Sequence, residues 1–205
     1  MNSPTPRSGL PTIIIVLLGA CGGCLLICIV AVVILVNAIK DSTPVALGRA
    51  AVLQRQKRYR EAEVLLLDAV RKSPNDPTVL NDLAWTYYLD GKSAEGEPYA
   101  KRAVSIENSP SNLDTLAHIH LGLKQIDQAE KEFKTVLDRN GNVAESHDGL
   151  GQIYESRGHF DKALKEYNRA IALDSSLDGT KERIARLEAS GHGSKTGAGK
   201  KKLPK

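Results

Sequence analysis

Small residues recur along this chain at a regular spacing of about 34 residues. A second series of small residues repeats the same period twelve positions further on. The first series contains Ala50, Ala84, Ala117 and Gly151, and the second contains Ala62, Gly96, Ala129 and Ala163. A period of this length is typical of stacked helical units, with small side chains where two helices cross. We therefore expect an all-α solenoid of four helix–turn–helix units.

Large apolar residues at helical spacing surround the small ones. In the last copy, Leu150 and Ile153 follow the 3.6-residue period of one helix, and Leu164 and Tyr167 follow that of the next. Gly158 stands between the two groups, where a turn favours a residue that tolerates positive φ. Each copy is thus predicted to form two amphipathic helices joined by a short turn.

The spacing and the residues at it resemble the tetratricopeptide repeat family over about 135 residues. The last copy carries Leu150, Gly151, Tyr154, Gly158, Phe160, Ala163, Tyr167 and Ala170 on the signature positions. The resemblance implies repeats at 43–76, 77–109, 110–143 and 144–177. We interpret 178–190 as a capping helix over the last repeat and 191–205 as a disordered basic tail.

An apolar segment precedes the repeats. Residues 13–36 contain no charge or amide, and as a helix they would span about 36 Å, more than the roughly 30 Å of a bilayer core. We expect a short tail at 1–12 and a single transmembrane helix at 13–39. The alternative is a bacterial lipoprotein anchored at Cys21, because Leu18 to Cys21 resembles a lipoprotein box. The apolar run continues well past Cys21, which favours the transmembrane helix.

Flanking charge predicts the orientation of this segment. Only Arg7 precedes it, whereas six Lys or Arg residues follow within about 20 positions, beginning with Lys40. The positive-inside rule then places the repeats in the cytoplasm.

Charge and motifs exclude several classes of function. From residue 44 to residue 190 there are 21 Lys or Arg and 23 Asp or Glu, which is not the profile of a nucleic-acid-binding domain. His118 and His120 stand two apart on a helix and so face different ways, and no nucleophile or phosphate-binding motif occurs. We expect no enzyme activity, no metal, no cofactor, no small-molecule substrate and no nucleic acid partner.

In the tetratricopeptide family the first helix of each repeat lines a concave groove. That resemblance implies a partner-binding groove formed by Asn81, Trp85, Tyr88, Asp114, His118, Asp148, Gln152 and Glu155, with Glu145 beside them. The alternative for Trp85 and Tyr88 is packing against neighbouring helices. The family's clamp for peptide carboxylates uses Lys, Arg and Asn, and it is absent here, because the matching positions hold Leu47, Ala51, Asp82, Ser111 and Thr115.

The expected function is therefore that of a membrane-tethered adaptor or scaffold that binds segments of other proteins. No Lys or Arg of the third or fourth copy opposes the groove carboxylates, so we expect a basic segment as the ligand. The alternative is a structural subunit of a membrane protein complex, of the assembly or secretion type, in which the groove is incidental.

Overall fold

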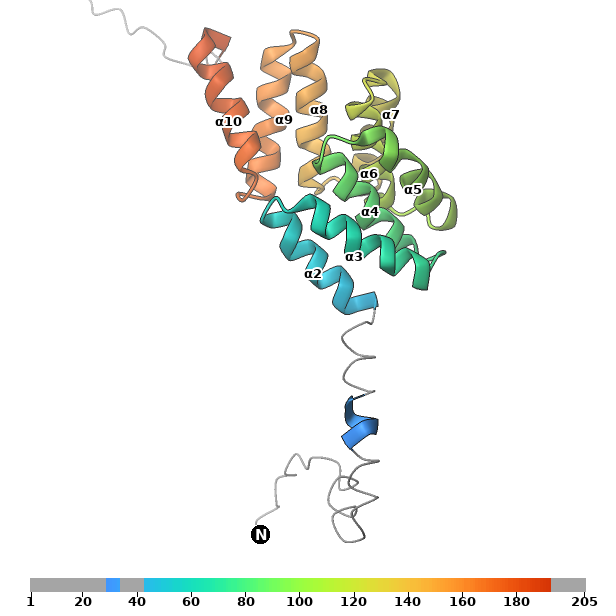
Figure 1. Ribbon diagram of the computed structural model, residues 1–205. Coiled ribbons are helices and arrows are strands. Elements are labelled where there is room, and N and C mark those ends of the chain that lie inside the picture. The colour runs from blue at the N-terminus through green and yellow to red at the C-terminus, as the bar shows by residue number, and fades with distance from the viewer. Residues whose placement is uncertain (1–28, 34–42, 193–205) are drawn as a thin grey trace, which may run out of the picture.

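The computed structural model describes residues 29–33 and 43–192 of the chain (Figure 1). Within these ranges all regular structure is helical. The helices are α2 (Thr43–Arg55), α3 (Tyr59–Lys72), α4 (Pro77–Leu89), α5 (Ser93–Ile106), α6 (Pro110–Gly122), α7 (Ile126–Arg139), α8 (Ala144–Ser156), α9 (Phe160–Leu173) and α10 (Asp178–Leu187), and a π-helical turn follows at Glu188–His192. The prediction of an all-α solenoid is confirmed.

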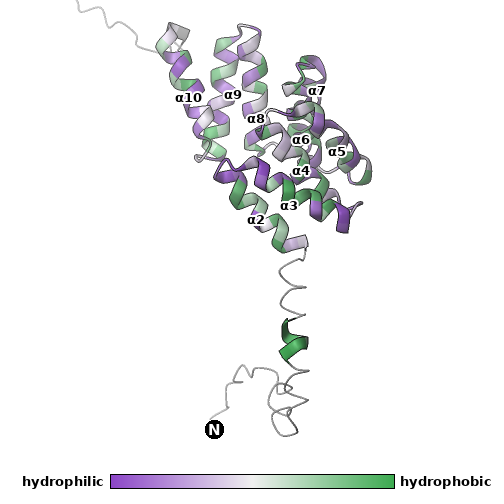
Figure 2. Cartoon of the chain, viewed as in Figure 1, coloured by the Kyte–Doolittle hydropathy of each residue, from purple (hydrophilic) through white to green (hydrophobic). Residues whose placement is uncertain are grey.

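Most of the predicted membrane segment lies outside the described residues. Of positions 13–39, only 29–33 are described, as a short helical turn with exposed apolar side chains that is green in Figure 2. Among the described residues, no helix combines the length and apolar character that crossing a bilayer requires. The basic tail also lies outside the described residues, apart from Gly191 and His192.

Local sequence sets the start of two of the inner helices. The Asp76 side chain accepts hydrogen bonds from the backbone N–H groups of Thr78 and Val79, and Pro77 opens α4. At α6 the Ser109 hydroxyl accepts a hydrogen bond from the backbone N–H of Asn112, and Pro110 opens the helix.

The turn inside each repeat uses one residue at positive φ. These residues are Lys57 (φ 58°), Gly91 (75°), Lys124 (61°) and Gly158 (73°), which again follow the repeat period. Glycine adopts this conformation without strain, whereas lysine does so at a cost of about 1 kcal/mol. The same turn is therefore built four times, although only two copies show it in their sequence.

Small residues stand at the helix crossings, as the period predicts. Ala50, Ala84 and Ala117 are fully buried. A Cβ on Gly96 would lie 2.7 Å from Ile119 Cδ1 and 3.1 Å from the Ala84 carbonyl oxygen, so even alanine would force the neighbouring atoms at this crossing to shift. Close approach at these points lets the larger residues interlock around them.

The hydrophobic core runs between successive repeats as a chain of small clusters. In the third and fourth repeats it gathers Ala117, Phe133, Leu150 and Ile153. At the C-terminal end, Leu187 of α10 packs with Ala163, Leu164 and Tyr167 of α9. Helix α10 therefore covers the apolar face that the last repeat would otherwise expose.

The first helices of successive repeats lie against one another. Helix α4 contacts both α2 and α6, and α6 also contacts α8, whereas each second helix contacts mainly its neighbours in sequence. The stack thus curves with α2, α4, α6 and α8 on its inner side. This inner row carries the predicted groove residues.

Candidate functional site

A hollow of 510 Å³ opens between the N-terminal halves of α4, α6 and α8. We call it the acidic hollow, because the charged side chains that line it are all carboxylates. Its wall is formed by Asn81, Asp82, Trp85, Ser109, Pro110, Ser111, Asp114, Thr115, Asn140, Val143 and Glu145. This wall contains no Lys, Arg or His, so the hollow attracts positive charge.

Asp114 is the most buried carboxylate of the acidic hollow. It is 7% exposed, and the Ser146 hydroxyl donates a short hydrogen bond to it. Burial raises the pKa of the Asp114 carboxyl to about 7, while the Ser146 hydrogen bond acts in the opposite direction. Burial, with a smaller contribution from Asp76, also raises the pKa of Asp82 to about 6. Both carboxyl groups therefore keep their proton to a higher pH than an exposed aspartate does.

His118 lies at the centre of an aromatic cluster beneath the groove. Its ring centroid is 5.2 Å from that of Trp85, 5.0 Å from that of Tyr88 and 4.8 Å from that of Phe133. The side chain is 2% exposed, and neither ring nitrogen makes a hydrogen bond; Asp114 Oδ2 is 3.7 Å from Nε2. Burial lowers the pKa of His118 to about 4, although nearby Asp148 and Glu145 favour its charged form. At neutral pH the imidazole is uncharged.

Trp85 and Tyr88 both pack and face the groove. Their rings stack at a centroid distance of 5.1 Å, and both side chains are half-buried. Trp85 lines the acidic hollow and also a second hollow of 440 Å³, which Tyr88 lines with it. The two alternatives for these residues are thus compatible, since each ring buries one side and presents the other.

The second hollow is the paired hollow, named for the ion pair at its centre. Asp148 accepts hydrogen bonds from Thr180 Oγ1 (2.6 Å), Gln152 Nε2 (2.7 Å) and Arg183 Nη1 (3.1 Å). Thr180 and Arg183 belong to α10, and Arg55 at the end of α2 lines the opposite side. In Figure 1 the start of α10 accordingly lies near the end of α2.

Glu155 does not line either hollow. It accepts hydrogen bonds from the Tyr167 hydroxyl (2.7 Å) and from Arg186 of α10 (2.6 Å). The prediction of uncompensated carboxylates is therefore wrong for Asp148 and Glu155, because the capping helix supplies an arginine to each. It holds for the acidic hollow, where Asp114 and Glu145 have no ion pair with Lys or Arg among the described residues.

Sequence reasoning misses part of the site. It gives Asp82, Ser111 and Thr115 no role beyond marking where a carboxylate clamp is absent, yet all three line the acidic hollow. Their positions on the first helices of the repeats are the sequence signal that could have placed them in the groove. The arginines of α10 give no such signal, because they stand in the helix that follows the four predicted repeats.

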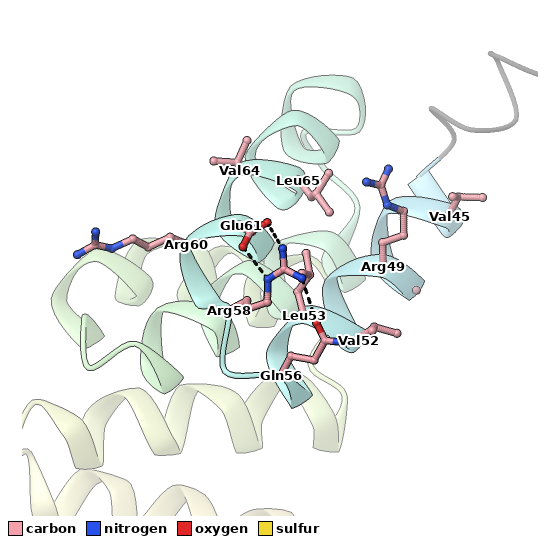
Figure 3. Close-up of a pocket in the computed structure, with 11 residues that line it drawn as sticks. Val45, Arg49, Val52, Leu53, Gln56, Arg58, Arg60, Glu61, Val64 and Leu65 are labelled. Atoms are coloured by element: carbon pink, nitrogen blue, oxygen red, sulfur yellow. Dashed lines mark hydrogen bonds and ion pairs between the residues drawn. The ribbon is translucent and has the colours of Figure 1, made fainter.

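A third hollow, of 960 Å³, lies at the N-terminal end of the stack (Figure 3). We call it the end hollow. Val45, Arg49 and Val52 of α2 and Glu61 and Val64 of α3 are among the residues that line it. Val52 is 50% exposed and Val64 is 67% exposed. Within the described residues, no helix covers this end as α10 covers the other.

Two stretches of the chain, residues 110–176 and 47–112, match the tetratricopeptide repeat. Together they include all of α3 to α9.

Two curated proteins share the repeat segment. Anaphase-promoting complex subunit CDC16 of Saccharomyces cerevisiae is 29% identical over 108 residues, which are 49% of this chain and 13% of that protein. A TPR repeat-containing protein of Pseudomonas aeruginosa is 40% identical over 50 residues, 24% of this chain and 8% of that protein. The chain thus matches only a small part of either relative.

A solved structure has the same fold. A thermophilic TPR protein of Thermus thermophilus aligns over 74% of this chain and 84% of its own, with a TM-score of 0.66 and 22% sequence identity. At that identity the likeness extends to the fold and no further.

Proposed function

Because the chain belongs to the tetratricopeptide repeat family, we propose that it is a membrane-tethered adaptor whose inner groove binds segments of other proteins. The observation that carries the proposal is the acidic hollow, which is large enough for side chains of a partner. Half-buried Trp85 at its edge supplies the aromatic anchor that protein interfaces use most.

Membrane tethering is proposed from the apolar segment at 13–39, and the charge asymmetry favours repeats in the cytoplasm. Protease added to intact cells should leave residues 43–190 intact. Digestion from outside would reverse this orientation. Cys21→Ala should leave the protein in the membrane, whereas release would favour the lipoprotein anchor.

Site-specific photo-crosslinking tests the groove. A benzoylphenylalanine at Ser111, which is exposed within the acidic hollow, should form crosslinks to partner proteins in cells. The same probe at Ser105, exposed on α5 outside both hollows, is the matched control.

Trp85→Ala should weaken the Ser111 crosslinks about tenfold or more, since an aromatic anchor contributes about 2 kcal/mol. Ile106→Ala, which truncates an exposed apolar residue on α5, should not. Equal crosslinking from both positions would exclude the groove.

The second candidate is a structural subunit of a membrane complex. The exposed Val52 and Val64 in the end hollow favour it, because an obligate subunit buries such a face against its neighbour. Sedimentation of the isolated 43–190 fragment distinguishes the two functions. An adaptor should sediment as a soluble monomer, and an obligate subunit should aggregate unless Val52 and Val64 are replaced by serine.

A further inference from the structure

We propose that the acidic hollow binds a cationic side chain, a guanidinium or an ammonium group, of a basic partner segment. This inference rests on the proposed adaptor function and names the chemistry of its ligand. It is carried by a comparison of equivalent positions in successive repeats, by orphaned polar atoms at the site and by the charge of the wall.

Three equivalent positions form a row along the inner groove. Asn81, Asp114 and Asp148 occupy the same place in the second, third and fourth repeats. Asp114 accepts a hydrogen bond from Ser146, and Asp148 accepts one from Thr180, which stands one repeat period after Ser146. The two carboxylates thus each have one hydroxyl donor, although Asp148 also accepts a hydrogen bond from Gln152.

Asp114 and Asp148 differ in whether the chain places a cation beside them. Asp148 also binds Arg183, but the position one repeat period before Arg183 is Gly149, which has no side chain to offer Asp114. A Cβ on Gly149 would overlap the Phe133 ring, so the close approach of α7 keeps this position small. The fold therefore supplies an arginine to one carboxylate and excludes it beside the other. A partner's cation can fill that missing place.

Unpaired polar atoms lie in and beside the acidic hollow. Asn81 Oδ1, in its wall, is buried without a hydrogen-bond partner. The ring nitrogens of His118, which lines the paired hollow, are also unpaired, and one of the two is an acceptor in the neutral imidazole. Buried acceptors are rarely left unpaired in folded proteins, because each costs about 1–3 kcal/mol. A guanidinium carries five N–H donors and an ammonium three, so either could satisfy acceptors that the chain leaves open. Trp85 at the edge adds an aromatic face for cation–π contact.

The charge balance also favours a cation. The N-terminal turns of α6 and α8 line the acidic hollow and contribute about +0.5 each through the helix dipole. Asp82, Asp114 and Glu145 exceed this when ionised, and burial raises the pKa values of Asp82 and Asp114. No group of three His, Cys, Asp or Glu among the described residues is placed to hold a metal ion. The geometry thus suits a side chain better than an ion.

Fluorescence of the full-length protein in a non-ionic detergent tests this site, because Trp85 is the only tryptophan. Acetylated hexa-arginine amide is the probe, and hexa-glutamate is the control peptide. Hexa-arginine should change the Trp85 emission with saturation, and hexa-glutamate should not. Glu145→Gln should weaken hexa-arginine binding about tenfold, while Asp138→Asn on the exposed face of α7 should change it less than about twofold.

A cation placed within the hollow gives a second variant that does not disturb the core. Ser111→Arg should compete with the peptide and weaken hexa-arginine binding about tenfold or more, and Ser105→Arg adds the same charge outside the hollow. Equal responses to the two peptides, or equal affinities of Ser111→Arg and Ser105→Arg, would overturn the cation site. The Ser111 crosslinks would persist in that case if the groove still binds partners, so the adaptor function and the cation site fail separately.

Discussion

The acidic hollow and the paired hollow share Trp85 and Glu145, but α2 and α10 line only the paired hollow. They differ in what the chain places opposite one repeated carboxylate. Asp148 has Arg183, whereas the corresponding position for Asp114 is Gly149. A repeated scaffold thus fixes where a carboxylate stands, and a single position in the following unit decides whether it serves the fold or remains available to a ligand.

The largest change in stability is expected from a substitution in the paired hollow. Asp148→Ala removes the acceptor of Thr180, Gln152 and Arg183 together, and leaves Arg183 beside the groove without its counter-charge. The free energy of unfolding should fall by about 3–5 kcal/mol, as for other ion pairs broken on one side. Chemical denaturation followed by circular dichroism measures this.

Asp178→Ala is the matched control on α10. Its carboxylate pairs with exposed Lys181, and surface pairs contribute about 0–1 kcal/mol. Similar losses in the two variants would mean that the Asp148 network does not hold α10 on the groove.

A substitution at Asp114 in the acidic hollow should instead raise the free energy of unfolding. The folded chain keeps a proton on Asp114 up to a pKa of about 7, but the unfolded chain loses it near the ordinary pKa of 3.8. Stability therefore falls as pH rises through that window. Asp114→Asn removes the buried charge and should stabilise the protein by about 2–4 kcal/mol near pH 8, with little change near pH 4. Destabilisation by Asp114→Asn near pH 8 would contradict the burial of an unpaired carboxylate.

The effect of His118 on the pH dependence of stability should be measurable in the Asp114→Asn variant. Its folded pKa of about 4 lies below the unfolded value of 6.5, so its contribution to stability is lost as pH falls from 6.5 to 4. In the wild type, protonation of Asp114 offsets this loss over the same range. Asp114→Asn should therefore lose stability on acidification more steeply than the wild type, and Asp114→Asn with His118→Phe should not. Parallel pH profiles for the first two proteins would exclude the offset.

The smallest effect is expected on peptide affinity, when the paired hollow is converted into a second acidic one. Arg183→Gln releases Asp148 from its ion pair and should raise the affinity for hexa-arginine about two- to fivefold at low salt. Arg186→Gln changes the same charge but releases Glu155, which lies outside both hollows. Equal gains in both variants would indicate a general charge effect and not a local one.

The period of small residues is enough to predict the solenoid, because Ala50, Ala84 and Ala117 stand where helices must touch. The same period places Asn81, Asp114 and His118 along the inner helices. In the structure Asn81 and Asp114 line one hollow, and His118 Nε2 is 3.7 Å from Asp114 Oδ2. It cannot predict the neutralisation of Asp148 and Glu155, since Arg183 and Arg186 act from α10, which lies beyond the last repeat.

The positive-φ turns at Lys57 and Lys124 are hidden for a different reason. Lysine is not a residue that marks this conformation, and only the equivalent Gly91 and Gly158 reveal it. A sequence pattern thus predicts a backbone conformation where a characteristic residue type occupies the position. It does not predict the same conformation where an ordinary residue is held in it by the surrounding fold.

The central claim is that a cation enters beside Asp114, and proton release on binding tests it most directly. Calorimetric titration of hexa-arginine near pH 6.5, in two buffers of different ionisation enthalpy, counts the protons exchanged. A cation beside Asp114 and Asp82 lowers their raised pKa values, so the wild type should release a substantial fraction of a proton, and Asp114→Asn should release less. Binding heats that are the same in both buffers for the wild type would contradict the account.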